Sequence, residues 1–530
     1  MTSTPKSNSD SPSSVRRIAI IGGGLAGLSA AHRFQELARQ SNKTIEITLI
    51  EAGSRLGGIV GTERIGDYLV DIGADSFLTT KPAAIGLCRR LGIEDRLLRT
   101  DPRYRGALVL YDGRPVPVPE GFQLLSPTAI WPVLTTPLFS TWGKLRLLME
   151  WFIPRRPDLV CDDADSSNQG TSAAISALTD ESVASFTRRR FGREALDRLI
   201  QPLVGGIYTS DPERLSLAAT MPRFLEMERD FGSLIRASLS KNSGRAIRDL
   251  QTNSDRTSEE VDSSSGARYG QFVGLQGGME DLVSALRAKV ESTCRVRLNT
   301  AVDRIEESQQ AQTSNSNQPA SSARFRLTFS DGTQEPYDAV TVATTGCRTA
   351  DLFRSLDEAL ANELRKTEFA SSALVVSGHR LADVRDPLRA FGLVIPHAER
   401  RQILAVSFSS RKFPNRAPAD RVLLRTFVGG ALQPDLFQTS DAEMIDLVQS
   451  ELSEILGVRG QPDFVRVYRY QNAMPQYHVG HLDRVARIEA RLGQHPGLAV
   501  AGIAYRGVGI PDVIASGERA AEELFSSLMG

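Results

Sequence analysis

The sequence has few cysteines, few aromatic residues and no net charge. Aromatic residues make up 6% of the chain, and the four cysteines of its 530 residues, Cys88, Cys161, Cys294 and Cys347, show no C-x-x-C spacing. This pattern argues against a metal site or a disulfide framework and fits a reducing compartment. Lys plus Arg and Asp plus Glu both number 63, so no overall field attracts an anionic polymer. We therefore expect no metal and no nucleic-acid partner.

The most apolar long stretch, 122–154, cannot cross a bilayer as one helix. Pro127, Pro132 and Pro137 interrupt it, and Lys144 and Arg146 charge its second half. Two interpretations stay open: short helices packed around a large apolar pocket, or an interfacial helix inserted into a membrane surface. The second would use six residues: Trp142, Leu145, Leu148, Met149, Trp151 and Phe152.

The N-terminal residues 1–14 are rich in Ser and Pro and lack the apolar core of a signal peptide. We expect a disordered tail over 1–15 and a cytoplasmic protein, with peripheral membrane contact left open. A transit peptide is the alternative interpretation of the tail. The chain is too long for one core, so it should divide into two or three domains.

The chain is organised around a glycine-rich turn near its N-terminus. A β-branched strand over 18–21 leads into Gly22, Gly23, Gly24, Leu25, Ala26 and Gly27, and an Ala-rich helix follows. This order is that of a dinucleotide-binding unit, in which the N–H groups at the helix start face a pyrophosphate. Gly22 would allow the tight turn, Gly24 the approach of the pyrophosphate, and Gly27 close packing of helix on strand.

A second strand, over 45–50, ends at Glu51, which follows Gly27 by 24 residues. An acid near this spacing hydrogen-bonds a ribose diol and repels a 2′-phosphate, which makes NADP an unlikely ligand. The continuation Glu51, Ala52, Arg55, Gly57 and Gly58 resembles the E-A-x-x-R-x-G-G extension of the superfamily that contains amine oxidases, phytoene desaturases and protoporphyrinogen oxidases. The resemblance implies FAD rather than NAD.

The remaining pattern predicts an α/β fold with a Rossmann-like FAD-binding domain, an antiparallel-sheet substrate domain and a helical subdomain. The FAD-binding domain would be discontinuous, over 16–85, 270–345 and 465–530. The helical subdomain would cover 86–240 and the substrate domain 346–464. Two polar segments, 241–269 and 307–322, have too little apolar content to form a core and are expected to be mobile insertions.

Two further sequence strings narrow the resemblance from the whole superfamily to one group of oxidases within it. The segment from Pro475 to His481 reads P-Q-Y-H-V-G-H, and the segment from Ile200 to Tyr208 reads I-Q-P-L-V-G-G-I-Y. Both are similar to strings of the oxygen-dependent protoporphyrinogen and coproporphyrinogen oxidases of haem biosynthesis. A strand, a Gly-rich turn and a final helix close the chain. There, G-I-P-D is closer to the Gram-positive type, which is similar to enzymes that act on coproporphyrinogen III.

By this resemblance, cofactor contacts carry over to residues near both ends of the chain and to Val302 between them. Beyond the six residues of the glycine turn, they are Glu51, Ala52, Arg55, Gly57, Gly58, Gly73, Ala74, Asp75, Ser76, Val302, Ile503, Val508, Gly509 and Ile510. The arginine that meets a propionate in the plant and animal enzymes aligns with Ala107 and is absent. Lys81 and Arg105 are the tentative replacements.

The resemblance implies oxidation of a porphyrinogen by six electrons, with a hydride passing to the flavin in each of three steps. No second G-x-G-x-x-G occurs, so electrons should come from the substrate and leave to O2. No catalytic side chain is assigned: His478 and His481 could act as bases or orient their segment. No cysteine follows Cys347, which predicts non-covalent FAD. A homodimer stays open.

Two alternatives to a porphyrinogen oxidase are kept. An amine oxidase or carotenoid desaturase of the same superfamily would share the glycine turn but not the P-Q-Y-x-V-G-H string. A non-catalytic protein resembling the GDP-dissociation inhibitors would not need an intact glycine turn with a ribose acid.

Overall fold

The structure is a computed structural model that describes residues 15–119, 122–123, 126–127, 130–157, 180–239, 271–308 and 323–529. The predicted tail over 1–15, except Val15, the insertion over 241–269 and nearly all of the polar segment 307–322 lie outside the described residues.

The predicted cofactor domain is built on a five-stranded parallel sheet in the order β12-β2-β1-β16-β22. Its strands are β1 (Arg16–Ile21), β2 (Ile45–Ile50), β12 (Arg295–Arg297), β16 (Ala339–Val342) and β22 (Leu498–Val500). Side chains alternate across the central strand, so that Ile18 and Ile20 pack into one apolar cluster and Ala19 and Ile21 into another. Both faces are therefore buried, as a parallel sheet requires.

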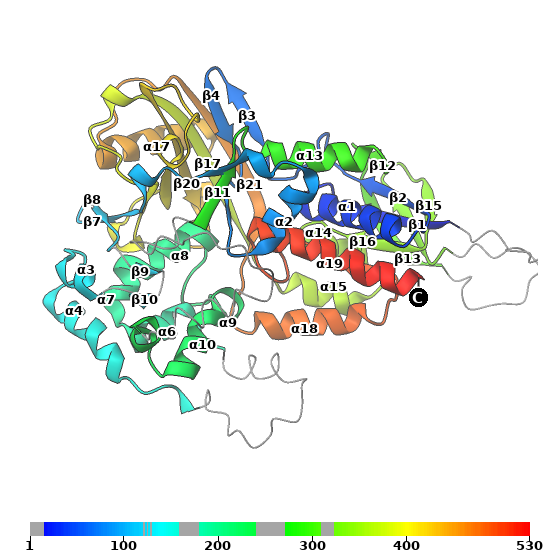
Figure 1. The fold of residues 1–530 in the computed structure, drawn as a ribbon, viewed down its shortest axis with the longest axis horizontal. Coiled ribbons are helices and arrows are strands. Elements are labelled where there is room, and N and C mark those ends of the chain that lie inside the picture. Colours follow the sequence, from blue (N-terminus) through cyan, green and yellow to red (C-terminus); the bar gives the residue numbers. More distant parts are fainter. Residues whose placement is uncertain are drawn as a thin grey trace, which may run out of the picture.

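Helices cover one face of this sheet, on the right of Figure 1. They are α1 (Leu25–Gln40), α2 (Pro82–Leu91), α13 (Glu280–Glu291) and α19 (Ile510–Met529). The other face packs against a three-stranded sheet, β13 (Val302–Glu307), β14 (Phe325–Phe329) and β15 (Gln334–Tyr337), and three helices, α14 (Gly346–Phe353), α15 (Glu358–Arg365) and α18 (His481–Leu492). The predicted α/β architecture of this domain is confirmed.

A second sheet of seven strands has the order β21-β17-β20-β19-β18-β7-β8. Its strands are β7 (Leu108–Tyr111), β8 (Arg114–Pro117), β17 (Phe369–Arg380), β18 (Gly392–Val394), β19 (Ala405–Phe408), β20 (Arg421–Gly429) and β21 (Phe464–Pro475). All neighbours are antiparallel except β18 and β7. Helix α17 (Asp441–Leu456) packs on it, with a capping box of Ser440 and Glu443.

The predicted domain limits and the sheet do not coincide. β7 and β8 come from the segment expected to be helical, and β21 comes from the segment assigned to the cofactor domain. Smaller sheets join the two large ones: β3 (Thr62–Ile65) pairs with β4 (Tyr68–Asp71), and β11 (Phe272–Leu275) lies between β5 (Phe77–Leu78) and β6 (Leu97–Arg99).

The helical subdomain lies at the lower left of Figure 1. Its helices are α3 (Ile130–Thr135), α4 (Thr141–Leu148), η3 (Met149–Phe152), α6 (Val183–Arg190), α7 (Arg193–Ala195), the π-helix η6 (Leu196–Ile200), α8 (Gln201–Tyr208), α9 (Leu217–Thr220), α10 (Pro222–Phe231) and α11 (Leu234–Leu239).

The sequence predicts one helix with an exposed arginine face over 181–200, and this is wrong in two respects. Gly192, at φ +91°, separates α6 from α7. Arg190 is fully buried and pairs with Glu150 at 3.2 Å and Glu228 at 3.0 Å. These long-range carboxylates compensate the charge of Arg190, and the local pattern could not reveal them.

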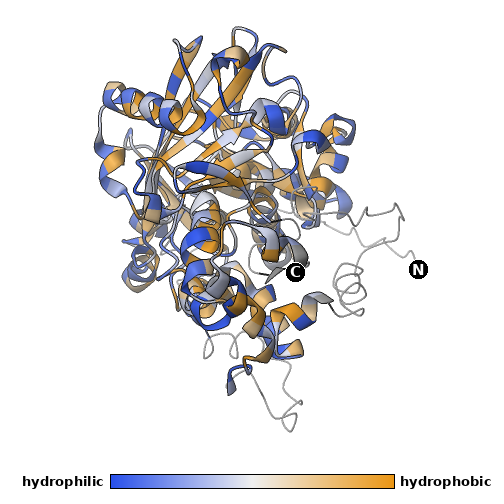
Figure 2. Ribbon diagram, turned by 90° about the vertical axis from the view of Figure 1, so that its left-hand side faces the viewer, coloured by the Kyte–Doolittle hydropathy of each residue, from blue (hydrophilic) through white to orange (hydrophobic). Residues whose placement is uncertain are grey.

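The outer side of α4 and η3 carries an exposed apolar stripe. Its members are Trp142, Leu145, Met149 and Phe152, with Trp142 80% and Phe152 79% exposed. Leu148 and Trp151, also named from the sequence, are only half-exposed. Figure 2 shows hydrophobic residues on the helices at the lower end of the molecule. None of the helices within the described residues has the length and apolar content to span a membrane.

Candidate active site

The glycine turn between β1 and α1 has the geometry of a phosphate cradle. Gly22 has φ +109°, and a Cβ on Gly27 would lie 1.9 Å from the Gly22 carbonyl oxygen, so both positions require glycine. A Cβ on Gly24, in contrast, would meet nothing within 4 Å. Gly24 is the N-cap of α1 and gives that helix no side-chain cap. The open space and the uncapped N–H groups fit a bound pyrophosphate.

Glu51 and the loop after it lie directly against this turn. The Glu51 carboxylate accepts hydrogen bonds from the N–H groups of Gly23 and Gly53, each at 2.7 Å. The Gly57 N–H donates to the Gly23 carbonyl at 2.8 Å, and a Cβ on Gly58 would lie 3.2 Å from the Gly24 Cα. The fold therefore brings these predicted cofactor residues together.

The other residues of the E-A-x-x-R-x-G-G extension support the same loop. Arg55 donates to the carbonyls of Leu56 at 3.2 Å, Val60 at 3.3 Å and Gly58, while Ala52 is exposed. Val302 begins β13 close to Glu51, since the nearby Thr300 N–H donates to the Glu51 carbonyl at 2.9 Å.

The predicted Gly73–Ser76 loop is held by two cations, Arg425 on β20 of the seven-stranded sheet and Lys412 at the end of the short helix α16 (Ser409–Lys412), which connects β19 and β20. Asp75 pairs with Lys412 at 2.7 Å and with Arg425 at 2.9 Å, and Lys412 also donates to the Ser76 hydroxyl at 2.7 Å. Burial alone would raise the pKa of Asp75, but the charges of Lys412 and Arg425 outweigh it and hold that pKa well below its ordinary value.

Arg425 completes this attachment of the loop by donating to the Gly73 carbonyl. Sequence analysis missed both cations. The sequence offered a signal for Arg425, because it is the one charged residue in the apolar strand V-L-L-R-T-F-V. A charge in such a strand needs a buried partner.

The C-terminal turn lies at the start of α19, beside the glycine turn. α19 packs so closely on α1 that a Cβ on Gly517 would lie 2.2 Å from the Ala26 carbonyl oxygen. Of the predicted contacts, Gly509 donates its N–H to Asp512 at 3.3 Å, Ile510 begins the helix, and Val508 packs against the core of the helical subdomain. Ile503 precedes them and accepts a hydrogen bond from the Tyr477 hydroxyl.

The two histidines of the P-Q-Y-H-V-G-H string have different surroundings. His481 is fully buried, and its Nε2 lies 2.8 Å from the Tyr505 carbonyl oxygen. Burial lowers the pKa of His481 to about 4, so the ring is neutral and Nε2–H donates to that carbonyl. His478 lies 3.8 Å from Glu368, and burial and Arg214 lower its pKa. These surroundings favour the interpretation that His481 orients its segment over that of a base.

The two tentative substrate cations lie on different elements. Lys81 precedes α2, is 51% exposed and pairs with Asp512 at 2.6 Å. Arg105 is exposed and lies just before β7.

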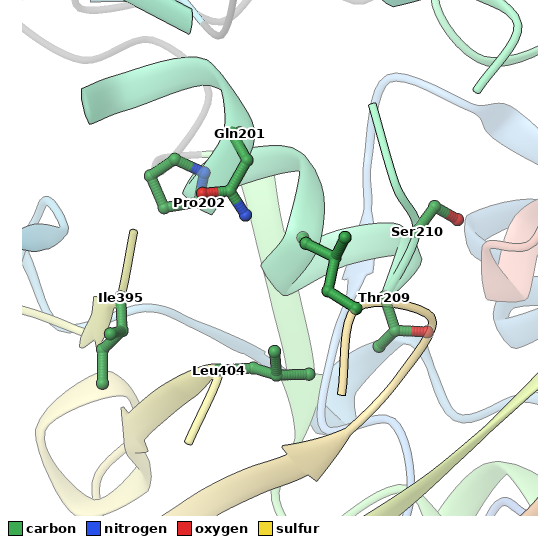
Figure 3. Close-up of a pocket in the computed structure, with 8 residues that line it drawn as sticks. Gln201, Pro202, Thr209, Ser210, Ile395 and Leu404 are labelled. Carbon is green, nitrogen blue, oxygen red and sulfur yellow. The ribbon is translucent and has the colours of Figure 1, made fainter. Parts of the chain in front are cut away.

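Figure 3 shows a small cavity between α8 and the ends of β18 and β19, around Gln201, Thr209, Ile395 and Leu404. The volume inside it that can hold a water-sized molecule is only about 10 Å³, far below the roughly 300–1,000 Å³ of usual ligand sites. Gln201 is already engaged, since its Oε1 accepts the His397 N–H at 2.8 Å. The cavity is thus a packing gap and is too small for a macrocyclic substrate.

Comparison of the sequence with known proteins shows which family the chain belongs to. The family of flavin-containing amine oxidoreductases matches residues 25–525. The chain is 31% identical to a coproporphyrinogen III oxidase of Staphylococcus aureus, over 97% of this chain and 100% of that protein. It is 32% identical to a coproporphyrinogen III oxidase of Propionibacterium freudenreichii, over 97% of this chain and 91% of that protein.

A solved structure agrees with these relatives. It is of a candidate protoporphyrinogen oxidase from Exiguobacterium sp. 255-15, with a TM-score of 0.76, 27% identity, and coverage of 97% of this chain and 99% of that one. The predicted resemblance to porphyrinogen oxidases is confirmed. The chain is therefore a flavin-dependent oxidoreductase and belongs to the family of flavin-containing amine oxidoreductases.

Proposed function

We propose that this chain oxidises coproporphyrinogen III to coproporphyrin III with FAD as its cofactor and O2 as the acceptor. The observation that carries the proposal is the match over nearly the whole length to proteins named coproporphyrinogen III oxidase. An amine oxidase or desaturase of the same fold is less well supported, because the solved amine oxidases match at about 15% identity.

The glycine turn would hold the cofactor's pyrophosphate on the uncapped start of α1, and Glu51 would accept hydrogen bonds from the adenosine ribose. Gly57 and Gly58 would lie beside the pyrophosphate, because both residues lie against Gly24. When bound, FAD supplies the hydride acceptor for each two-electron step. The chain's own part is to clamp the macrocycle, exclude water and position the reacting carbon.

The cofactor is proposed to be non-covalent. Burial raises the pKa values of Cys88 and Cys294, Cys161 lies outside the described residues, and no cysteine follows Cys347, so the C-terminal segment carries no thiol that could bind the flavin. Acid precipitation should therefore release the flavin into the supernatant. Flavin that stays with the denatured pellet would show a covalent bond and contradict this part of the proposal.

Lys81 is the first candidate to meet a substrate propionate, and Arg105 is the second. Lys81 follows the Gly73–Ser76 loop by five residues and lies beside the C-terminal turn through Asp512. Since half of its side chain is exposed, a carboxylate could compete with Asp512 for the ammonium group.

We also propose that the apolar stripe of α4 and η3 rests on a lipid surface. The stripe cannot turn inward: neighbouring Glu150 is buried and accepts the N–H groups of Leu234 and Ile235 at 2.9 and 3.1 Å. Trp142→Ser with Phe152→Ser should reduce co-sedimentation with vesicles, whereas Val15→Ser, at the edge of β1, should not. Equal sedimentation of both variants would contradict the contact.

The direct test of the proposed activity is to add coproporphyrinogen III to the purified protein in air. Formation of fluorescent coproporphyrin together with O2 uptake is the expected result. A yellow protein that oxidises an amine but no porphyrinogen would overturn the proposal, and a colourless protein unable to bind flavin would overturn the cofactor with it.

A further inference from the structure

We propose that Tyr477 and His481 are positioning residues for the bound flavin, which hold the turn from Gly502 to Gly507 in the orientation that the cofactor needs. The proposal rests on the proposed function, in that it assumes FAD binding. Hydride transfer to a flavin does not itself require the P-Q-Y-H-V-G-H string. The proposal gives this string the role of positioning the cofactor turn.

Tyr477 holds the first part of the turn. Its hydroxyl donates to the Ile503 carbonyl. A buried tyrosine hydroxyl usually finds such partners. The direction of the Ile503 carbonyl is therefore fixed by a single buried side chain.

His481 holds the middle of the turn. Its Nε2–H donates to the Tyr505 carbonyl at 2.8 Å. The Tyr477 and His481 rings are stacked, with centroids 4.0 Å apart and planes 14° from parallel. Both side chains are buried, at 1% and 0% exposed, so neither can reach a substrate as a proton acceptor from this position.

The direction of the two carbonyls sets the direction of the following N–H groups. In a planar trans peptide, the carbonyl of one residue points opposite to the N–H of the next. With the Ile503 and Tyr505 carbonyls turned toward Tyr477 and His481, the N–H groups of Ala504 and Arg506 point away from them. Neither N–H donates to an acceptor within the described part of the chain. They are thus available to a ligand beside the start of α19.

The opposite side of the same segment is fixed to the helical subdomain. The Tyr477 carbonyl accepts the Ser216 N–H at 2.8 Å, and the Gly480 N–H donates to Asp180 at 3.1 Å. Asp180 in turn accepts the Ser216 hydroxyl at 2.7 Å. The segment therefore couples the position of the cofactor turn to the subdomain expected to hold the substrate.

Backbone N–H groups of this turn, beside the start of α19, would favour the negative charge of a reduced flavin bound there. Tyr477→Phe and His481→Leu should therefore each raise the FAD Kd about 3- to 10-fold, the equivalent of one hydrogen bond, and lower the flavin midpoint potential. His481→Gln, which retains an N–H donor, should recover most of both losses. Tyr337→Phe is the matched control, because it removes another buried tyrosine's hydrogen bond, to Glu335 at 2.8 Å.

The experiment titrates FAD into each apoprotein by flavin fluorescence, measures the potential by dye equilibration, and records thermal unfolding. A purely structural role would lower the melting temperature but leave the FAD Kd and the potential at wild-type values, and that result would overturn the proposal. Should the wild-type chain bind no FAD, the proposed function would fail and this proposal with it. Wild-type binding with unaffected variants would overturn this proposal alone.

Discussion

Gly24 offers a way to separate folding from cofactor binding with a single methyl group. Its backbone angles, φ −70° and ψ −178°, suit any residue, and an added Cβ meets nothing within 4 Å. Gly24→Ala should therefore leave the free energy of unfolding of the apoprotein within about 0.5 kcal/mol of wild type. The methyl group would, however, occupy the space that the proposed function gives to the pyrophosphate.

The expected loss of affinity follows from that steric conflict. Inserting a methyl group into a filled site costs about 1–3 kcal/mol, which corresponds to an FAD Kd raised about 5- to 150-fold. Fluorescence titration of the apoprotein measures the Kd, and denaturant unfolding measures the stability. Gly86→Ala in α2 is the matched control, since its Cβ is equally unobstructed and its position is outside the predicted site.

Gly27→Ala is a second comparison variant, in which the added methyl group is expected to disturb the fold itself. Its Cβ would lie 1.9 Å from the Gly22 carbonyl oxygen, so this variant should lose stability and FAD binding together. If Gly24→Ala bound FAD as tightly as Gly86→Ala does, the glycine turn would not be the pyrophosphate site. If it unfolded like Gly27→Ala, the space beside Gly24 would not be open, and the reasoning from geometry would be refuted.

Three further predictions concern charged residues. Glu51→Ala should raise the FAD Kd about 10- to 100-fold by removing a charge-assisted acceptor, whereas Glu46→Ala should not; equal affinities in a fluorescence titration would refute this role. Lys81→Ala should raise the KM about 2- to 5-fold, as an exposed ion pair allows, and leave kcat nearly unchanged. The effect should be larger for coproporphyrinogen, with four carboxylates, than for protoporphyrinogen, with two; unchanged O2-uptake kinetics would redirect the search to Arg105. Asp75→Asn should lower the free energy of unfolding by about 3–5 kcal/mol, because it leaves Lys412 and Arg425 without their buried partner. Since the folded-state pKa of Asp75 is depressed, its stabilisation is present above about pH 4 and is lost as the pH falls further; a wild-type minus variant difference that did not shrink in acid would contradict this assignment.

The parts of the site that could be predicted are those with local signals. The glycine turn, Glu51 and the turn before α19 each combine a strand, a turn and a helix within a short segment, and such patterns depend on backbone conformation alone. The structure brings the glycine turn and the C-terminal helix together although their residues are almost 500 positions apart.

The missed parts depend on contacts between distant segments. Asp75 was predicted as a loop residue, but its partner Arg425 comes from the seven-stranded sheet and its partner Lys412 from the short helix between β19 and β20. Arg190 was assigned to an exposed helical face. Its partner Glu150 lies in another helix, so the local sequence pattern gave no sign that the Arg190 charge is paired and buried. The sequence left both interpretations of His481 open, because only its burial and its hydrogen bond to the Tyr505 carbonyl favour an orienting residue over a base.

The most direct measurement is anaerobic reduction of the bound flavin by coproporphyrinogen III, compared with protoporphyrinogen IX. The proposed function predicts loss of the visible flavin absorbance with coproporphyrinogen III, faster than with protoporphyrinogen IX, and its return when O2 is admitted. A flavin that remains oxidised in the presence of both porphyrinogens would contradict the account.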